Sequence, residues 1–203
     1  KLFDDADFYL HEGDKVGVIG INGTGKSTLL KIMAGLETPD EGQVIQASNL
    51  MIHYLPQNPE FSEEDTVLQS VQNMVHHHAN ENELIAAKAM LTRLGITDFE
   101  QKTRELSGGQ RKRLALVSVL ITPCDVLILD EPTNHLDSEM ADWLENKLQA
   151  FRGALVMVTH DRYFLDSVTN KIIELDKGKI YSYDEKYSGF LQRKAEREES
   201  VRA

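Results

Sequence analysis

The sequence contains a single cysteine, Cys124, among its 203 residues. A lone cysteine excludes an internal disulfide and suits a reducing compartment, so we expect a cytoplasmic protein. The sequence also lacks a secretory signal and any apolar run of the roughly 18 residues that a membrane helix needs. We therefore expect no membrane insertion by this chain.

Positive charge is scarce. Lys and Arg number 22 against 33 Asp and Glu, which gives a formal net charge of −11. Such a surface repels nucleic acid phosphates at long range, and the short basic run Arg111-Lys112-Arg113 is too small to reverse this.

Hydrophobic content of 41% is ordinary for a globular protein. The first residue, Lys1, is not Met, which suggests a fragment of a longer protein.

The most informative segment is the glycine-rich stretch 20–28, with the sequence GINGTGKST. An apolar run, 16–19, precedes it, and 29–33 has helical apolar spacing, so strand, loop and helix follow one another as a phosphate-binding G-x-x-x-x-G-K-[ST] motif requires. The glycines let backbone N–H groups turn inward, and the helix N-terminus adds partial positive charge. The expected ATP-binding residues are Gly20, Asn22, Gly23, Thr24, Gly25, Lys26, Ser27 and Thr28.

Within this loop, Lys26 is expected to reach the β- and γ-phosphates and Ser27 to ligate Mg²⁺ through its hydroxyl. The alternative is an ordinary glycine-rich turn that happens to contain Lys-Ser. That alternative is disfavoured because every motif position is filled and both flanks have the required pattern.

A carboxylate pair, Asp130-Glu131, ends the nearly continuous apolar run 125–129, which is typical of a strand buried on both faces of a parallel sheet. Ligands of α/β proteins bind at this carboxyl edge. We expect Asp130 to hold the metal and Glu131 to act as the general base that activates water. The alternative role for the pair is to cap the following turn.

Two more polar residues follow predicted strands. His160 comes after the apolar run 154–158, and we expect its imidazole to contact the γ-phosphate and to hold Glu131 and the water in line. Gln57 follows the strand predicted at 51–55, and its amide is expected to reach the metal or the water. A lone histidine is more often structural, and the assignment of Gln57 is weak from chemistry alone.

A second anion site is predicted at Ser107-Gly108-Gly109-Gln110, where Ser107 is the expected N-cap of a helix that ends before Pro123. One nucleotide needs only one phosphate cradle. The second cradle therefore raises the question of whose phosphate it holds.

The remaining pattern predicts strands at 44–45, 51–55 and 154–158 and a hairpin of strands 171–175 and 179–183. Helices are expected within 65–94 and at 138–151, and the aromatics Trp143, Tyr163 and Phe164 are expected in the core. Neighbouring helical residues point in different directions, so His76-His77-His78 cannot converge on one metal ion and are expected on a solvated face.

Together these motifs resemble those of the ATP-binding cassette (ABC) ATPases. Segment 20–28 resembles their Walker A motif, and segment 127–131 resembles their Walker B motif. Gln57 corresponds to their Q-loop, and segment 106–110 corresponds to their signature motif. Segment 134–137, which ends in Asp137, resembles their D-loop, and His160 corresponds to their switch histidine. The resemblance implies an α/β P-loop cassette with a mixed, mostly parallel sheet, a small antiparallel β subdomain and a helical signature subdomain. It further implies a cassette at 1–191, with a core lobe at 1–57 and 124–191, a helical subdomain at 62–123, and a charged interdomain linker at 192–203.

Segments 129–137 and 159–166, and the exit 187–197, are similar to the ABC-F subfamily, whose members carry two cassettes and in many cases act on ribosomes. The resemblance implies an N-terminal cassette that uses ATP and Mg²⁺ and closes head to tail with a second cassette, in the same chain or a homodimer. Ser107 and Gly109 would then grip the partner's γ-phosphate, and the isolated domain would hydrolyse ATP only weakly. The first strand and the adenine-stacking aromatic of the family would lie before Lys1, which leaves Phe3 as only a poor substitute candidate.

Two other functions remain open. The chain can be the cytosolic ATPase subunit of an ABC membrane transporter, although transporters rarely carry the pair Asn134-His135 or the run 162–164. It can also be a degenerate cassette that binds ATP only as a structural clamp. That alternative is disfavoured because the chain has all four of the residues Lys26, Asp130, Glu131 and His160.

Overall fold

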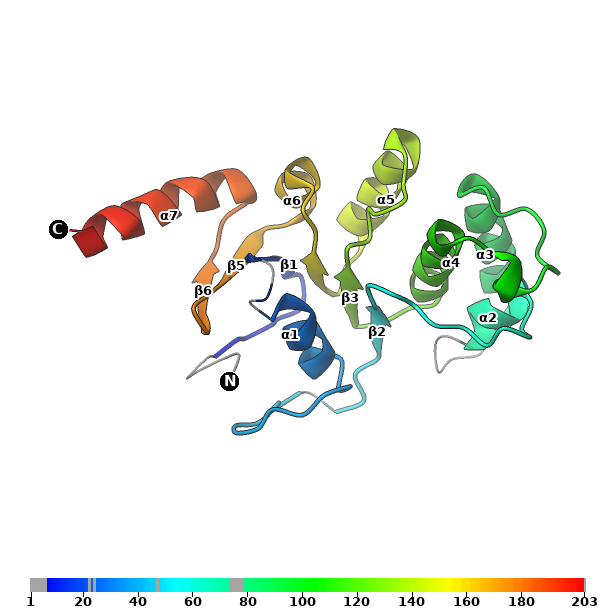
Figure 1. Cartoon of the computed structure of the whole chain (residues 1–203), viewed down its shortest axis with the longest axis horizontal. Coiled ribbons are helices and arrows are strands. Elements are labelled where there is room, and N and C mark those ends of the chain that lie inside the picture. Colours follow the sequence, from blue (N-terminus) through cyan, green and yellow to red (C-terminus); the bar gives the residue numbers. More distant parts are fainter. Residues whose placement is uncertain (1–6, 22, 24, 47, 74–78, 203) are drawn as a thin grey trace.

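One mixed β-sheet organises the chain in a computed structural model that describes residues 7–21, 23, 25–46, 48–73 and 79–202 (Figure 1). The strands are β1 (Lys15–Ile19), β2 (Ile52–Leu55), β3 (Val126–Asp130), β4 (Ala154–Val158), β5 (Lys171–Asp176) and β6 (Lys179–Tyr183). The helices are α1 (Lys26–Met33), α2 (Val67–Asn73), α3 (Glu81–Arg93), α4 (Gly108–Leu120), α5 (Ser138–Ala150), α6 (Arg162–Val168) and α7 (Tyr187–Arg202), with a short 3-10 helix at Thr103–Glu105.

The strand order is β2-β3-β4-β1-β5-β6, and every neighbouring pair is parallel except the antiparallel hairpin β5–β6. The predicted mixed, mostly parallel α/β sheet is therefore confirmed, and its antiparallel component is a hairpin of the same sheet. The strand predicted at 44–45 is wrong. Val44 and Ile45 are 51% and 82% exposed and belong to no strand, and none of the strands in the described part of the chain pairs with them.

The two faces of the sheet are covered by different helices. Helix α1 buries Leu29 and Leu30 against one set of alternating strand residues, which includes Val16, Ile128 and Val156. On the opposite face, α5 and α6 pack with the intervening residues of β3 and β4 (Figure 1). Burial on both faces accounts for the continuous apolar runs of these strands. Phe164 is in this core as expected, whereas the prediction for its neighbour Tyr163 is wrong, since that ring is 70% exposed at the helix surface.

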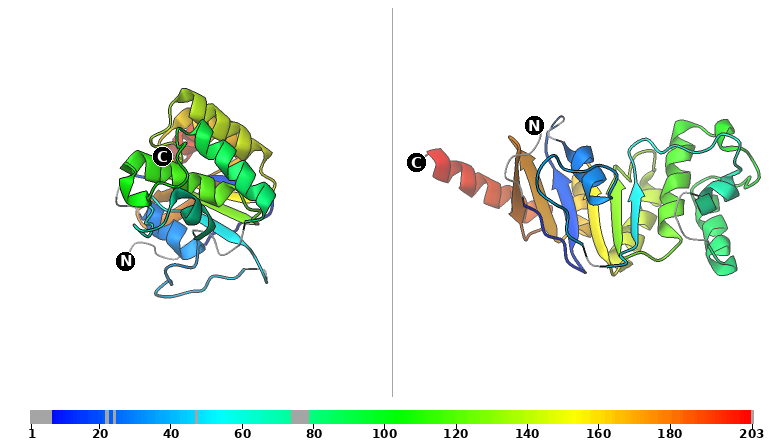
Figure 2. Two further views of the ribbon diagram at one scale, coloured as in Figure 1. Left: turned by 90° about the vertical axis from the view of Figure 1, so that its right-hand side faces the viewer. Right: turned by 90° about the horizontal axis from the view of Figure 1, so that it is seen from below.

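Helices α2, α3 and α4 gather beyond the β2 edge of the sheet, at the opposite end of the molecule from α7 (Figure 2). They share a hydrophobic cluster of their own, which includes Val71 of α2, Leu91 of α3 and Leu114 of α4. The opposite side of α4 contributes Leu116 and Val119 to the core of the sheet. Helix α4 is thus the element that joins the two groups. His76-His77-His78 lie outside the described residues.

The C-terminal segment is a single helix, α7, which starts at Tyr187 and runs through the expected linker boundary at 191/192 to Arg202. Its first turn is fixed by Ser188, whose backbone N–H and hydroxyl both donate to Asp166. Further along, the Glu174 carboxylate, buried on β5, binds Lys194 Nζ at 2.7 Å and Arg197 Nη2 at 3.0 Å. Among the described residues, every helix is too short or too polar to span a bilayer.

The buried carboxylate of Glu174 should control how firmly α7 is held. Replacing it (Glu174→Ala) removes the common partner of Lys194 and Arg197, so we expect a loss of roughly 1–3 kcal/mol of unfolding free energy. Amide exchange should accelerate after residue 190. Denaturant unfolding and hydrogen exchange test this.

The matched control is Glu185→Ala, which breaks the partly exposed pair between Glu185, just before α7, and Arg193 of α7, and should change the unfolding free energy by less than about 1 kcal/mol. Equal effects of the two substitutions would contradict a special role for the buried carboxylate.

Candidate active site

The predicted site residues meet at the carboxyl ends of four adjacent strands. The glycine loop follows β1, His160 follows β4, Asp130 ends β3 with Glu131 directly after it, and Gln57 follows β2. These residues surround one cleft of about 290 Å³. Its lining consists of Gly23, Gly25, Lys26, Ser27, Thr28, Gln57, Asp130, Glu131, Val158 and His160.

The glycine loop has the backbone that an anion cradle requires. Gly23 and Gly25 have φ angles of +85° and +90°, a left-handed conformation in which a side chain would be strained. Gly25 is also the N-cap of α1, and because it has no side chain to cap the helix, the N–H groups of the first turn remain available to an anion. Lys26 Nζ donates to Gly20 O and so lies across the loop. Asn22 and Thr24 lie outside the described residues.

A hydroxyl and a carboxylate lie together at the base of the cleft. Ser27 Oγ donates to Asp130 Oδ2 at 2.8 Å, which joins the start of α1 to the end of β3. Oxygen donors of this kind suit Mg²⁺, which binds through a few protein ligands and otherwise keeps waters or phosphate oxygens. Within the described ranges no cluster of three or more His, Cys, Asp or Glu side chains offers a complete protein cage for an ion. The donor set therefore fits a Mg²⁺ ion that arrives with a phosphate ligand.

Glu131 faces His160 across the cleft, with 3.1 Å between Oε1 and Nε2. The glutamate side chain is 7% exposed and the histidine 70%. Burial raises the pKa of the Glu131 carboxyl, and the adjacent His160 opposes that rise. A carboxyl with a raised pKa is a stronger base than an ordinary glutamate, as general base catalysis near neutral pH requires.

The second predicted anion site is separate from this cleft. Ser107 is the N-cap of α4 as expected, and its hydroxyl accepts from Gln110 N while Gln110 Oε1 accepts from Ser107 N, at 3.2 and 2.9 Å. Neither these residues nor Gly108 and Gly109 belong to the described lining of the cleft. In Figure 1, α4 lies on the far side of β2 from α1. Asp137 is likewise outside the lining, and its Oδ1 caps α5 by accepting from Met140 N.

One residue near the site was missed in the sequence. Lys112 of α4 is 4% exposed, and its ammonium donates to Pro56 O, Gln57 O and Asp130 O at 2.8, 3.2 and 2.6 Å. Burial lowers its pKa to about 8. The basic run 111–113 is thus not a surface patch. Arg111 donates to carbonyls of Thr103 and Arg104, and Arg113 donates to His135 O.

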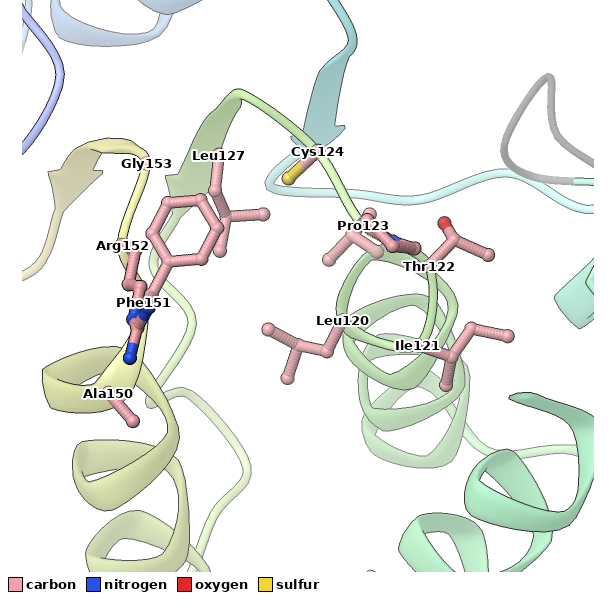
Figure 3. Close-up of a pocket in the computed structure, with 11 residues that line it drawn as sticks. Leu120, Ile121, Thr122, Pro123, Cys124, Leu127, Ala150, Phe151, Arg152 and Gly153 are labelled. Carbon is pink, nitrogen blue, oxygen red and sulfur yellow. The ribbon is translucent and has the colours of Figure 1, made fainter. Parts of the chain in front are cut away.

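A larger hollow of about 400 Å³ lies at the other end of the strands, between the end of α4 and the loop that follows α5 (Figure 3). Leu120, Pro123 and Phe151 give it an apolar lining, and it contains Cys124, whose pKa is raised to about 12 by burial. That thiol stays protonated at neutral pH and is a poor nucleophile. The smaller cleft, with its lysine, carboxylates and exposed loop amides, is the candidate active site.

The pKa of Glu131 should depend on its contact with the His160 side chain. Because the histidine lowers that pKa against the effects of burial and Asp130, His160→Ala should raise the pKa of the Glu131 carboxyl further. The protonated form of Glu131 should then persist to higher pH than in the unmodified protein. The measurement is the carboxyl carbon chemical shift of Glu131 followed by NMR as a function of pH.

A suitable control is His135→Ala, since His135 is not among the groups that shift Glu131. A lower pKa in His160→Ala, or an identical change in both variants, would contradict the direct contact between Glu131 and His160.

Comparison with known proteins agrees with this geometry. The family model described as ABC transporter matches residues 3–134. The chain is 41% identical to the ABC transporter ATP-binding protein YfmR of Bacillus subtilis, over 97% of this chain and 37% of that protein. The alignment covers 234 positions, more than the 203 residues of the chain, so YfmR has residues in this region without a counterpart here.

The chain is also 37% identical to the energy-dependent translational throttle protein EttA of Escherichia coli, over 91% of this chain and 40% of EttA. EttA is an ABC-F ATPase, so the resemblance to that subfamily is confirmed. The chain spans about two fifths of the length of these relatives. Among solved structures, a dimeric ATP-binding cassette bound to ADP and Pi in a post-hydrolysis state has a TM-score of 0.74 at 23% identity, covering 90% of each chain, which supports the fold.

Proposed function

Because this chain belongs to the ABC transporter family, whose cassettes bind and hydrolyse ATP, we propose that it is a Mg²⁺-dependent ATPase cassette of a translation factor. The observation that carries the proposal is the convergence of Lys26, the pair Ser27–Asp130 and the pair Glu131–His160 on one cleft. A cradle for phosphates, a set of metal ligands and a base for water are the parts that phosphoryl transfer to water requires.

In this proposal the loop amides of 20–28 and Lys26 bind the β- and γ-phosphates, as the left-handed glycines and the position of the lysine support. Ser27, Asp130 and Gln57 hold Mg²⁺, directly or through water, and the ion supplies neutralisation of the charge that develops on the phosphates. Asn22, Gly23, Thr24 and Thr28 complete the nucleotide-binding residues.

Glu131 accepts a proton from the attacking water, since its raised pKa and its place in the cleft suit a general base. His160 orients the carboxylate through the contact at 3.1 Å and faces the γ-phosphate. The clamp alternative, in which ATP only holds the cassette together, is disfavoured by this pair.

The signature residues Ser107, Gly108, Gly109 and Gln110 are proposed to bind the ATP of a second cassette, in the same protein or a second copy. Their absence from the described lining of this chain's own cleft supports this. Asp137 is assigned to the same interface. A chain without its partner would then hydrolyse ATP weakly.

We further propose a core lobe at 1–57 and 124–191 and a helical subdomain at 62–123. The separate hydrophobic cluster of α2, α3 and α4 supports this division. The segment 192–203 is proposed as the start of an interdomain linker that leaves the cassette as part of α7.

Action on the ribosome is proposed from the similarity to EttA, which is named as a translational throttle. The alternative is the ATPase subunit of a membrane transporter, which the similarity to the ABC transporter ATP-binding protein YfmR and to the ABC transporter family model leaves open.

The substitution Glu131→Gln tests the chemistry. It removes the proposed base but preserves the shape of the side chain, so ATP turnover in the complete protein should fall by about 10²–10⁴-fold while ATP binding persists. Turnover and equilibrium binding of ATP with Mg²⁺ are the measurements. The exposed Glu100→Gln is the control and should leave turnover unchanged. Unchanged turnover in Glu131→Gln would remove Glu131 from the mechanism.

The trapped variant also tests the partner. Glu131→Gln should hold the closed, ATP-bound state, so with ATP it should sediment with ribosomes when a cell extract is separated into ribosome and membrane fractions. The double variant Lys26→Ala/Glu131→Gln, which lacks the phosphate-binding lysine, should stay in the supernatant. Sedimentation with membranes alone would favour the transporter alternative.

A further inference from the structure

Lys112 is a buried cation at the junction of three segments that are distant in the sequence. It belongs to the second turn of α4, and its three hydrogen bonds go to carbonyl oxygens after β2 and at the end of β3. An ammonium group has three protons to donate, so each proton has one acceptor. Lys112 itself is not among the described residues that line the cleft. Any effect of Lys112 on the cleft is therefore exerted through the backbone groups that it contacts.

The carbonyl of Asp130 belongs to the peptide group that joins Asp130 to Glu131. Lys112 Nζ holds the oxygen of this peptide at 2.6 Å, and Val158 O accepts from its N–H, on Glu131, at 2.7 Å. The peptide plane is thus fixed at both ends, between α4 and β4. Directly after it, Glu131 has a φ angle of +52°, in the left-handed region that a residue with a side chain rarely adopts. Such a conformation persists only where the surroundings impose it.

The direction of the Glu131 side chain follows from this peptide plane. Rotation of the plane would carry the carboxylate away from His160 Nε2, its partner at 3.1 Å. The same ammonium also binds the carbonyl oxygens of Pro56 and Gln57. Two side chains that line the cleft, Gln57 and Glu131, are therefore positioned by one residue of α4.

The contact with α4 extends beyond Lys112. In the next position along the helix, Arg113 Nη1 donates to His135 O at 3.1 Å. At the start of the helix, a side chain in place of Gly109 would meet the His135 side chain at 3.3 Å. The beginning of α4 and the loop 130–137 consequently form one closely packed unit.

From these contacts we propose that Lys112 is a positioning residue for ATP hydrolysis, which fixes the Asp130–Glu131 peptide so that the Glu131 carboxylate points into the cleft. The inference rests on the proposed role of Glu131 as general base. According to this inference, Lys112 affects the rate of the chemical step but not the affinity for ATP, although it lies outside the cleft.

The test compares Lys112→Met, which keeps the length and apolar stem but removes the donors, with Arg111→Met in the complete protein. Arg111 lies next to Lys112 on α4 and binds carbonyls near the 3-10 helix instead of the catalytic peptide. In Lys112→Met we expect kcat to fall by about 10²-fold, as for a displaced catalytic group, with the dissociation constant for ATP changed less than about twofold. Arg111→Met should retain kcat within about threefold.

A double substitution shows whether Lys112 acts through Glu131. If it does, adding Lys112→Met to Glu131→Gln should lower the residual rate by less than about threefold, because residues that act as a unit are not additive. A full additional loss of about 10²-fold would overturn the inference. If Lys112→Met does not fold, Lys112→Gln, whose amide keeps two of the three N–H donors but carries no charge, is judged by the same criteria.

The outcomes separate the two proposals. If Glu131→Gln leaves turnover unchanged, the proposed general base fails. If Glu131→Gln lowers turnover but Lys112→Met does not, only the positioning role is overturned. A parallel fall of kcat, ATP affinity and melting temperature in Lys112→Met would show that Lys112 merely stabilises the fold, and would also overturn the inference.

Discussion

The order of the parallel strands is the constraint on which the rest of the site depends. The hydrogen bond between Ser27 and Asp130 is one result of that order. Asp130 ends β3 and Ser27 follows β1, with β4 between them in the sheet. Because all of these strands run in the same direction, their carboxyl ends lie at one edge, and side chains separated by about a hundred residues meet there. The loop, His160, Glu131 and Gln57 occupy successive positions along this edge. A strand order that placed β5 or β6 between these four strands would separate at least one of them.

Most of this arrangement could be predicted from the sequence because the signals were local. The phosphate loop, β3, β4 and the hairpin β5–β6 each have an apolar pattern with a clear turn or polar end, and the structure has them within a residue or two of the predicted bounds. The strand predicted at 44–45 failed because strand formation depends on a neighbouring strand, which local sequence does not reveal. The attachment of α7 to the sheet was missed because its contacts, such as Glu174 with Lys194 and Arg197, join segments whose charges look solvated in the sequence.

Lys112 shows how a buried functional residue is concealed in a charged run. As the middle residue of the run Arg111-Lys112-Arg113, Lys112 suggests a basic surface patch. Helical spacing, however, places Lys112 on the same face as Ala115, Leu116 and Val119, all of which are buried. That periodicity was the available signal, since a lysine aligned with core positions must find acceptors inside the protein. The carbonyl oxygens that it finds could not be inferred, because they come from two strand ends that only the fold brings together.

These contacts give α4 two roles that depend on each other. Its first residues, capped by Ser107, form the cradle proposed for a partner's phosphate, and its second turn holds the peptide that precedes Glu131. A helix is stiff over so short a distance, so a shift of its start by a bound phosphate would be transmitted to Lys112 and then to the Asp130–Glu131 peptide. Engagement of the partner's ATP at one end of α4 would thereby alter the geometry of the base in this chain's own cleft. If the start of α4 binds a partner's phosphate as proposed, the separation of the two anion sites would allow two cassettes to coordinate hydrolysis.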